Sequence, residues 1–266
     1  MTSTAQHSTA QHSTAQHSTA QHSKLKYRLC LVYIIGVHLL VAVLIFKTDF
    51  IPKVKAKFLA TTTATNPHGE RMIVYHQAMD ASVPAGATIF LGDSITQGLA
   101  TAAVSPSSVN YGIGSETTSE LLANLPKYQS LERASAAFLM IGINDIGQGK
   151  TQHLASQLRA VAAAIPKDLP LVWSGIMPAY SVKIDPAQIT AANRAIQEIC
   201  AARGNCIYVD TQELLSAGGA NLFRDGVHPN DQGYAIWITA LRKAYQELAQ
   251  QKSNNSFKPT PLRGAA

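Results

Sequence analysis

Short apolar runs alternate with amphipathic segments through the second half of the chain. The runs are continuous, as in strands that are buried on both faces of a parallel sheet, and do not alternate with polar residues. They comprise residues 87–91, 109–111, 136–141, 171–174 and 206–209. The segments between them have the length and apolar periodicity of helices, so the pattern predicts a parallel sheet covered by helices.

Two of the predicted helices are well defined by the sequence, one by the residues that begin and end it and the other by its apolar face. Asp185-Pro186 supplies a capping side chain and a first-turn proline, and Gly204 ends the helix that they begin. The final helix follows Asn230 and carries one apolar face, made of Tyr234, Trp237, Leu241, Tyr245 and Leu248. Both helices flank the predicted strand at residues 206–209.

The first part of the chain has a different pattern. Residues 3–22 are four copies of Ser-Thr-Ala-Gln-His, so residues 1–23 are interpreted as a low-complexity segment. Leu29–Phe46 is an apolar stretch of 18 residues without a formal charge, which has the length of a membrane-spanning helix. No small-residue cleavage site follows it, so residues 24–47 are predicted to form an uncleaved, single-pass membrane anchor rather than a signal peptide. A buried core helix is the alternative.

Composition divides the remainder into a linker, a domain and a tail. Residues 48–70 contain Pro52, Thr61-Thr62-Thr63 and Pro67 and are interpreted as a linker. Residues 71–250 hold all five apolar runs and are long enough for one medium-sized domain, but not for two. The polar residues 251–266 are expected to form a disordered tail.

The net charge of +6 is located outside the predicted domain. Residues 24–57 contain seven Lys and Arg against one acid, and the tail adds three bases. The remaining chain has 12 bases and 15 acids, a net charge of −3. Basic residues that flank an apolar stretch favour anionic lipid headgroups as their partner and argue against a nucleic acid. The three bases before the stretch and four after it leave the membrane orientation open.

The predicted domain contains two cysteines, Cys200 and Cys206, on either side of the turn that joins a helix to a strand. The five intervening residues could bring the two thiols within disulfide distance, which would indicate an oxidising compartment. Since both residues also continue apolar patterns, two reduced core thiols are the alternative.

Polar residues follow the predicted strands at their carboxyl ends, where open parallel sheets bind ligands. The first run leads into Gly92-Asp93-Ser94, with Ser94 at the start of a helix, and the third leads into Gly142-Ile143-Asn144-Asp145. A glycine-containing turn follows the second run, and Asp225-Gly226-Val227-His228-Pro229 precedes the last helix. Asp and His three residues apart can share a hydrogen bond that fixes the imidazole tautomer. Each block alone is a common turn, but together they indicate a nucleophile, a base and donors for an anion.

At this point the sequence resembles the GDSL or SGNH esterase/lipase family of serine hydrolases. The resemblance covers residues 87–248, with the blocks FLGDSITQG, NYGIGSETT, GIND and DGVHP in family order. It implies a three-layer α/β/α, flavodoxin-like fold. It also implies Ser94 as nucleophile, His228 as general base and Asp225 as its orienting acid, with backbone N–H groups of Ser94 and Ser115 and the side chain of Asn144 forming the oxyanion hole.

One position departs from the family pattern, which has glycine where this chain has Ser115. A backbone N–H is the expected donor there, so serine can still serve, but its backbone angles are more restricted than those of glycine. We therefore expect an effect on catalytic efficiency and not on the class of reaction.

The expected function is a membrane-anchored serine ester hydrolase that cleaves acyl or acetyl esters through an acyl-enzyme. A thioesterase, a lysophospholipase and a deacetylase of envelope glycans are alternatives within the family, and a catalytically weak module that binds an acylated ligand is an alternative outside catalysis. No cofactor or metal is expected, since His76 and His153 lack further ligands at metal spacing and no Walker or dinucleotide motif is present. The resemblance favours a hydrolase domain outside the cytoplasm, acting on a small-molecule, lipid or glycan ester.

Overall fold

The computed structural model describes residues 26–40, 43 and 66–256, the last five of them by backbone alone. The chain divides into two compact units, Met1–Thr65 and Asn66–Ala266. In the first unit, residues 26–40 are helical. The rest of the predicted anchor, apart from residue 43, lies outside the described residues, as do the repeat and most of the predicted linker. Among the described residues, no helix combines the length and the apolar character that a membrane crossing requires.

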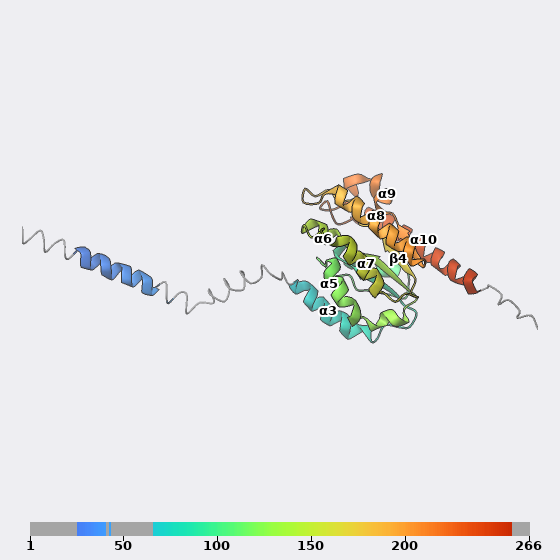
Figure 1. The fold of residues 1–266 in the computed structure, drawn as a ribbon, viewed down its shortest axis with the longest axis horizontal. Helices are drawn as coiled ribbons and strands as arrows, with labels where there is room; N and C mark the ends of the chain where they lie inside the picture. Colours follow the sequence, from blue (N-terminus) through green and yellow to red (C-terminus); the bar gives the residue numbers. More distant parts are fainter. Residues whose placement is uncertain (1–25, 41–42, 44–65, 257–266) are drawn as a thin grey trace, which may run out of the picture. The chain divides into compact units, whose positions relative to one another are not determined.

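A parallel five-stranded sheet forms the centre of the second unit (Figure 1). Its strands are β1 (Thr88–Gly92), β2 (Ser108–Asn110), β3 (Ala136–Met140), β4 (Leu171–Ser174) and β5 (Cys206–Val209). All five predicted strands are therefore present, with ends displaced by no more than one residue. The strand order is β2-β1-β3-β4-β5, which is the flavodoxin-like order.

The α-helices of this unit lie before, between and after the strands. They are α3 (Pro67–Asp80), α4 (Ser94–Gln97), α5 (Thr118–Asn124), α6 (Ile143–Gly147), α7 (Leu154–Ala164), α8 (Pro186–Arg203), α9 (Thr211–Ser216) and α10 (Asp231–Ser256). Short 3-10 helices are η1 (Thr101–Ala103), η2 (Leu125–Lys127), η3 (Gln129–Arg133) and η4 (Gly219–Leu222). The predicted helix after Asp185 and the final helix are both present.

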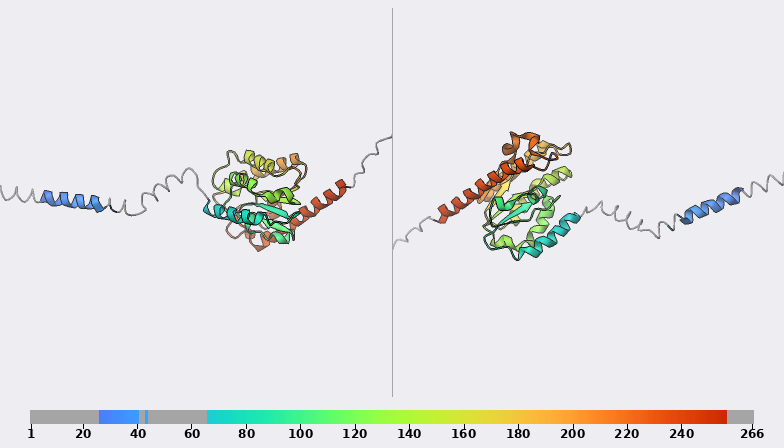
Figure 2. Two further views of the ribbon diagram at one scale, coloured as in Figure 1. Left: turned by 90° about the horizontal axis from the view of Figure 1, so that it is seen from below. Right: turned by 180° about the vertical axis from the view of Figure 1, so that it is seen from behind.

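The strand order, together with the right-handedness of the connections between parallel strands, determines which face of the sheet each helix covers. The chain moves in one direction across the sheet from β2 to β5, so right-handed crossovers place α5, α7 and α8 on one face, where they lie side by side. Helix α10 contacts β4 and β5 and packs its Tyr245 ring against Phe138 of β3, which in turn stacks on Phe90 of β1. Figure 2 shows the last turns of α10 extending beyond the sheet.

Both predicted limits of the domain differ from the structure. Helix α3 begins at Pro67, inside the segment interpreted as a linker, because Asn66 caps it and Pro67 occupies the first turn. Helix α10 continues to Ser256, beyond the predicted boundary at Gln250, so the first residues of the predicted tail are helical. Residues 257–266 lie outside the described residues.

Cys200, in the last turns of α8, and Cys206, at the start of β5, form a disulfide bond. Their Cα atoms are 5.1 Å apart. Of the two states that the sequence left open, the structure therefore has the oxidised one. The bond closes the turn at Gly204, where the chain passes from the helix to the edge strand of the sheet.

Candidate active site

Ser94 lies at the carboxyl end of β1, as the first residue of α4. Gly92, the last residue of β1, has a φ of +151°, and a Cβ atom there would lie 2.1 Å from the carbonyl oxygen of Met140 on β3. Glycine thus allows the ends of the two central strands to approach closely where the chain turns. Asp93 then caps α4 by accepting a hydrogen bond from the N–H of Ile95 at 3.0 Å. The nucleophile candidate is fixed at the sheet edge by its immediate neighbours in sequence.

Residues 225–228, here called the catalytic loop, carry the Asp and His candidates. Asp225 Oδ1 accepts hydrogen bonds from the N–H groups of Val227 (3.0 Å) and His228 (2.9 Å). Gly226 has a φ of +82°, and its carbonyl oxygen accepts a hydrogen bond from Tyr180 N at 2.7 Å. The loop is therefore closed by the side chain of Asp225 and attached to the segment after β4.

The three candidate side chains form a continuous hydrogen-bonded chain. Ser94 Oγ lies 2.8 Å from His228 Nε2, and His228 Nδ1 lies 2.7 Å from Asp225 Oδ2. The hydrogen bond from the N–H of His228, with further hydrogen bonds from the ring and from Val227, lowers the pKa of Asp225 to about 2. Since an ionised carboxylate only accepts, Nδ1 must donate to Asp225, which leaves Nε2 of the neutral ring to accept the Ser94 proton.

Three groups could donate hydrogen bonds to an oxyanion beside Ser94. Within residues 66–256, the backbone N–H groups of Ser94 and Ser115 have no acceptor. Asn144, at the start of α6, donates one N–H of its side-chain amide to the carbonyl oxygen of Glu116 at 2.9 Å. An amide nitrogen carries two hydrogens, so the second N–H of Asn144 remains for a ligand.

Ser115 occupies the left-handed region of backbone space. Its φ is +65°, the one positive φ of a non-glycine residue among the described residues. Glu116 N donates to Ile113 O at 3.2 Å, so residues 113–116 form a turn with Ser115 at its third position. Gly114, at the second position, is not among the glycines with positive φ, so the positive φ of Ser115 identifies a type II turn, which favours glycine at the third position. We call residues 113–116 the oxyanion turn, and its geometry is one in which glycine would be less strained than Ser115.

Each of these donor residues has a buried carboxyl residue next to it in the sequence. The side chains of Asp93 and Glu116 are 0% and 1% exposed, and each has one oxygen without a hydrogen-bond partner. Burial raises the pKa of Asp93 to about 7 and that of Glu116 to about 8. Asp145, also buried, accepts hydrogen bonds from the backbone and side chain of Thr118, and burial raises its pKa too. These three carboxyl groups therefore carry less negative charge near pH 7 than three exposed acidic residues would.

An open pocket of about 440 Å³ adjoins the candidate side chains. It is lined by Asn144, Asp225 and His228, together with Ile143, Gly147, Gln148, Ser181, Lys183, Ile184 and Val227. The segment after β4 and helix α6 thus form its walls. Met177 and Trp237 are buried in the core and do not line this pocket. Tyr180 is 45% exposed.

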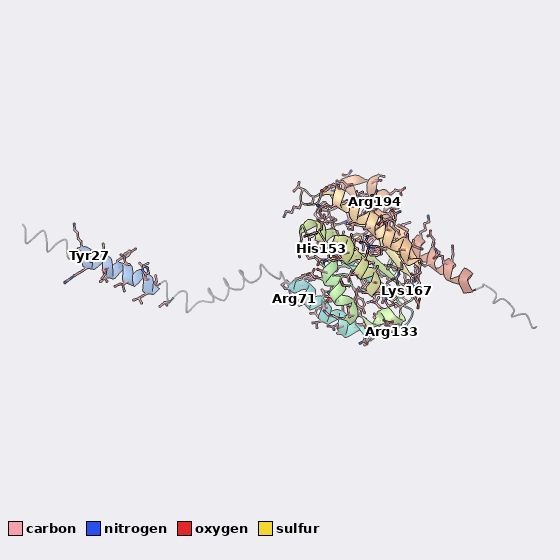
Figure 3. The ribbon with its side chains drawn as sticks, viewed as in Figure 1. Tyr27, Arg71, Arg133, His153, Lys167 and Arg194 are labelled. Atoms are coloured by element: carbon pink, nitrogen blue, oxygen red, sulfur yellow. A yellow bond between two sulfur atoms is a disulfide. The ribbon has the colours of Figure 1, made fainter. Side chains whose placement is uncertain are left out.

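The remaining histidines of the domain show no metal-binding arrangement. In the part of the chain that the structure describes, no group of three or more His, Cys, Asp or Glu side chains could hold a metal ion. His76 is buried beside Tyr128, and burial lowers its pKa to about 4. His153 precedes α7, where Figure 3 labels it.

Sequence reasoning assigned no role to Asn66, Gln97 and Glu116, and all three contact the oxyanion turn or belong to it. Gln97 Oε1 accepts a hydrogen bond from Gly114 N at 2.6 Å, and Asn66 Nδ2 donates to Gly114 O at 2.8 Å. The capping signature Asn66-Pro67 was a usable signal for the start of α3, but nothing in the sequence pairs Asn66 with a residue 48 positions away.

Comparisons with known proteins agree with this geometry. The model of the GDSL-like lipase/acylhydrolase family matches residues 90–236, more than half of the chain. The comparison with curated proteins found no match.

Solved structures with the same fold include three bacterial proteins. One, from Streptococcus pneumonia and named for platelet activating factor, has a TM-score of 0.61 at 23% identity, over 74% of this chain and 99% of its own. A lipase/acylhydrolase from Enterococcus faecalis has a TM-score of 0.55 at 20% identity, over 60% and 96%. A variant of an acetyl-xylooligosaccharide esterase from Geobacillus has a TM-score of 0.51 at 22% identity, over 59% and 94%. At these identities the likeness concerns the fold, whereas the family model matches the sequence itself, and we conclude that this chain belongs to the GDSL-like lipase/acylhydrolase family.

Proposed function

We propose that this protein is a serine hydrolase that cleaves acyl or acetyl esters through a covalent acyl-enzyme. The observation that carries the proposal is the continuous hydrogen-bonded chain from Ser94 through His228 to Asp225, of which His228 and Asp225 line an open pocket. Such a chain activates a hydroxyl that is otherwise a weak nucleophile.

In the proposed first half-reaction, Ser94 Oγ attacks the carbonyl carbon of the ester while His228 Nε2 takes the Ser94 proton. The imidazolium that forms is stabilised by the ionised carboxylate of Asp225. His228 then gives the proton to the leaving alkoxide, and the acyl group remains on Ser94. In the second half-reaction, water loses a proton to His228 and attacks the acyl-enzyme, and His228 then returns the proton to Ser94 Oγ as the bond to the acyl group breaks and the carboxylic acid is released.

The negative oxygen of each tetrahedral intermediate would be bound by Ser94 N–H, Ser115 N–H and the Asn144 side chain. These donors are fixed before the substrate arrives: Ser94 by the cap of α4, Ser115 by the oxyanion turn and Asn144 by its hydrogen bond to Glu116 O. Fixed dipoles that meet developing charge need no reorganisation during the reaction, which is why such donors lower the barrier.

Two measurements on the purified full-length protein test this proposal. The first is hydrolysis of chromogenic esters with acyl chains from acetyl to decanoyl, and the second is covalent labelling of Ser94 by an alkyl phosphonate, read by mass spectrometry. We expect both to succeed. If the protein retains a long-chain acyl ester without hydrolysing it, and Ser94 stays unlabelled, the chain is an acyl-binding module and the proposal is wrong.

The alcohol part of the substrate is a separate question. A structural neighbour is an acetyl-xylooligosaccharide esterase, and the pocket beside His228 is lined by polar as well as apolar side chains. Both points support acetylated glycans as candidate substrates in addition to lipid esters. Release of acetate from acetylated oligosaccharides, compared with release of fatty acid from lysophospholipids at equal concentration, would separate the glycan and lipid alternatives.

We further propose that residues 29–46 anchor the protein in a membrane with the hydrolase domain outside the cytoplasm. The support is the 18-residue apolar stretch with its basic flanks and the Cys200–Cys206 disulfide, since disulfides persist in oxidising compartments. The full-length protein should sediment with membranes, and deletion of residues 1–57 should release it. Protease added to intact spheroplasts should digest the domain; recovery of full-length protein in the soluble fraction would contradict the anchor.

A further inference from the structure

Within residues 66–256, the peptide group between Gly114 and Ser115 has a hydrogen-bond partner at its carbonyl end only. Its N–H, on Ser115, is a proposed oxyanion donor, and its carbonyl oxygen, on Gly114, accepts a hydrogen bond from Asn66 Nδ2 at 2.8 Å. In a planar trans peptide, the C=O and N–H bonds point in opposite directions. A hydrogen bond that fixes the direction of the Gly114 carbonyl therefore also fixes the direction of the Ser115 N–H, on the opposite side of the peptide.

We propose that Asn66 is a positioning residue that fixes this peptide plane, so that Ser115 N–H points into the oxyanion hole. The inference rests on the proposed function, because it assigns Asn66 a part in the same acyl transfer. Asn66 does not touch the substrate in this proposal. It acts through the Gly114 carbonyl.

Ser115 makes such a constraint necessary. The oxyanion turn is of type II, and types I and II differ by a flip of the peptide between their two central residues, which here are Gly114 and Ser115. A type I turn would give Ser115 the negative φ that L-residues favour. It would, however, turn the Gly114 carbonyl to the side to which the Ser115 N–H now points. Glycine at position 115 would adopt the type II turn without strain, whereas serine needs a stabilising hydrogen bond from outside the turn.

The neighbouring peptide groups are held by other side chains. Gly114 N donates to Gln97 Oε1 at 2.6 Å, and Glu116 O accepts from Asn144 Nδ2 at 2.9 Å. Both contacts would survive a flip of the central peptide, because Gly114 N belongs to the peptide before it and Glu116 O to a peptide farther along the chain. The hydrogen bond from Asn66 would not survive, so it is the contact that distinguishes the two turns.

Asn66 is itself held firmly. Its Oδ1 caps α3 by accepting a hydrogen bond from Gly69 N at 3.0 Å, so both ends of its amide are engaged. The far end of α3 is bound through Asp80, which accepts hydrogen bonds from Tyr111 OH and Ser130 N, and Arg133 donates to the Asp80 carbonyl at 2.6 Å. Figure 3 labels Arg71 near the first end of α3 and Arg133 near the second. Helix α3 lies before the matched residues 90–236, so this support comes from outside the family region.

The two functions of Asn66 can be separated by substitution in the full-length protein. Asn66→Asp keeps an oxygen that caps α3 but replaces the donating NH₂ with an acceptor, and Asn66→Ser is an uncharged residue that also caps helices. Ester hydrolysis should fall about tenfold in kcat for Asn66→Ser and further for Asn66→Asp, with KM changed less than twofold, because the oxyanion develops after binding. Arg71→Ala, exposed on the same helix, is the matched control and should retain wild-type kcat.

A double variant tests the mechanism of the effect. If Asn66 holds a turn that serine resists, then Asn66→Ser made in a Ser115→Gly background should cost less than threefold in kcat, instead of about tenfold. An equal loss in both backgrounds, a loss confined to KM, or wild-type kcat in Asn66→Ser would each overturn the proposal.

The inference also has a test that does not depend on hydrolysis. If the wild-type protein cleaves no ester and the phosphonate does not label Ser94, the proposed function fails by itself. Crystal structures of Asn66→Ser with Ser115 and with Ser115→Gly then decide the inference. We expect the Gly114–Ser115 peptide to be flipped, with negative φ at Ser115, in the single variant and unflipped in the double variant. An intact type II turn in the single variant would overturn it.

Discussion

The catalytic loop and the oxyanion turn are two short segments at one sheet edge, but different forces hold them. The catalytic loop is stabilised mainly by residues within it: Asp225 binds the N–H groups of Val227 and His228 as well as the imidazole ring. The oxyanion turn is held by side chains from three distant segments, which contribute Asn66, Gln97 and Asn144.

Their electrostatic surroundings differ as well. Asp225 is 56% exposed and has a lowered pKa, so its charge is stabilised by hydrogen bonds and by solvent. Glu116, in the oxyanion turn, is buried with a raised pKa, so its carboxyl group is largely neutral at pH 7. The loop that would move protons is thus determined by local sequence and charged, whereas the turn that would bind an oxyanion depends on tertiary contacts and is kept near neutrality. Substitutions should affect the two segments in different ways.

Removing the nucleophile should have the largest effect. Ser94→Ala leaves the catalytic loop intact but eliminates the acyl-enzyme route, so turnover should fall on the order of 10³-fold or more. The rate of ester hydrolysis measures this, with the far-UV circular dichroism spectrum as the control for folding. A folded variant with a near-wild-type rate would mean that the hydrogen-bonded chain to His228 is not the catalytic one.

Asn144→Ala should come next, with a loss of about 10²–10³ in kcat and a smaller change in KM. Its amide is proposed to meet charge that exists only in the transition state, and it also holds the Glu116 carbonyl. Gln148→Ala is a suitable control, since Gln148 lines the same pocket without donating to the turn. An effect on KM alone would indicate that Asn144 binds the substrate and does not stabilise the oxyanion.

Ser115→Gly should preserve kcat or raise it by up to about tenfold, because glycine adopts the positive φ without strain and a better-aligned donor contributes on the order of 1 kcal/mol. Stability should change little: the left-handed conformation costs serine about 1–2 kcal/mol, and the freedom of glycine in the unfolded chain costs about 0.5–1 kcal/mol. Steady-state kinetics and urea unfolding measure the two effects. A hundredfold loss of activity in a folded variant would assign an active role to the Ser115 hydroxyl.

Glu116→Gln should have the smallest effect on activity and a visible effect on the pH dependence of stability. Because burial raises the pKa of Glu116 from 4.5 to about 8, the native protein keeps a proton that the unfolded chain loses. Unfolding in this window releases that proton, so stability falls as pH rises from about 4.5 to about 8, by up to about 1.4 kcal/mol per pH unit. The glutamine variant should lose this slope.

Urea unfolding at several pH values between 5 and 8 would measure the free energy of unfolding in each variant. Glu132→Gln, at an exposed position, is the control and should keep the wild-type slope. Equal slopes for wild type and Glu116→Gln would show that Glu116 is ionised in the native protein. Asp93, whose pKa burial raises to about 7, should leave part of the slope in both proteins.

Much of this protein was determined by its sequence. Continuous apolar runs placed all five strands, because burial on both faces of a parallel sheet imposes that pattern locally. Asp185-Pro186 and Gly204 placed the limits of α8, because capping depends on neighbouring residues. The same holds for Asp225 and His228, whose three-residue spacing already permits the hydrogen bond that the structure contains.

Other features were decided only by the tertiary structure. Ser94 and His228 are 134 residues apart, and their contact exists because β1 and the catalytic loop end at the same edge of the sheet. The sequence also left the pairing of Cys200 with Cys206 open, and the burial of Glu116 and the positive φ of Ser115 depend on packing between distant segments. Local propensity favours a negative φ for serine, and only the contacts of the folded chain, among them that of Asn66 with Gly114, reverse this preference.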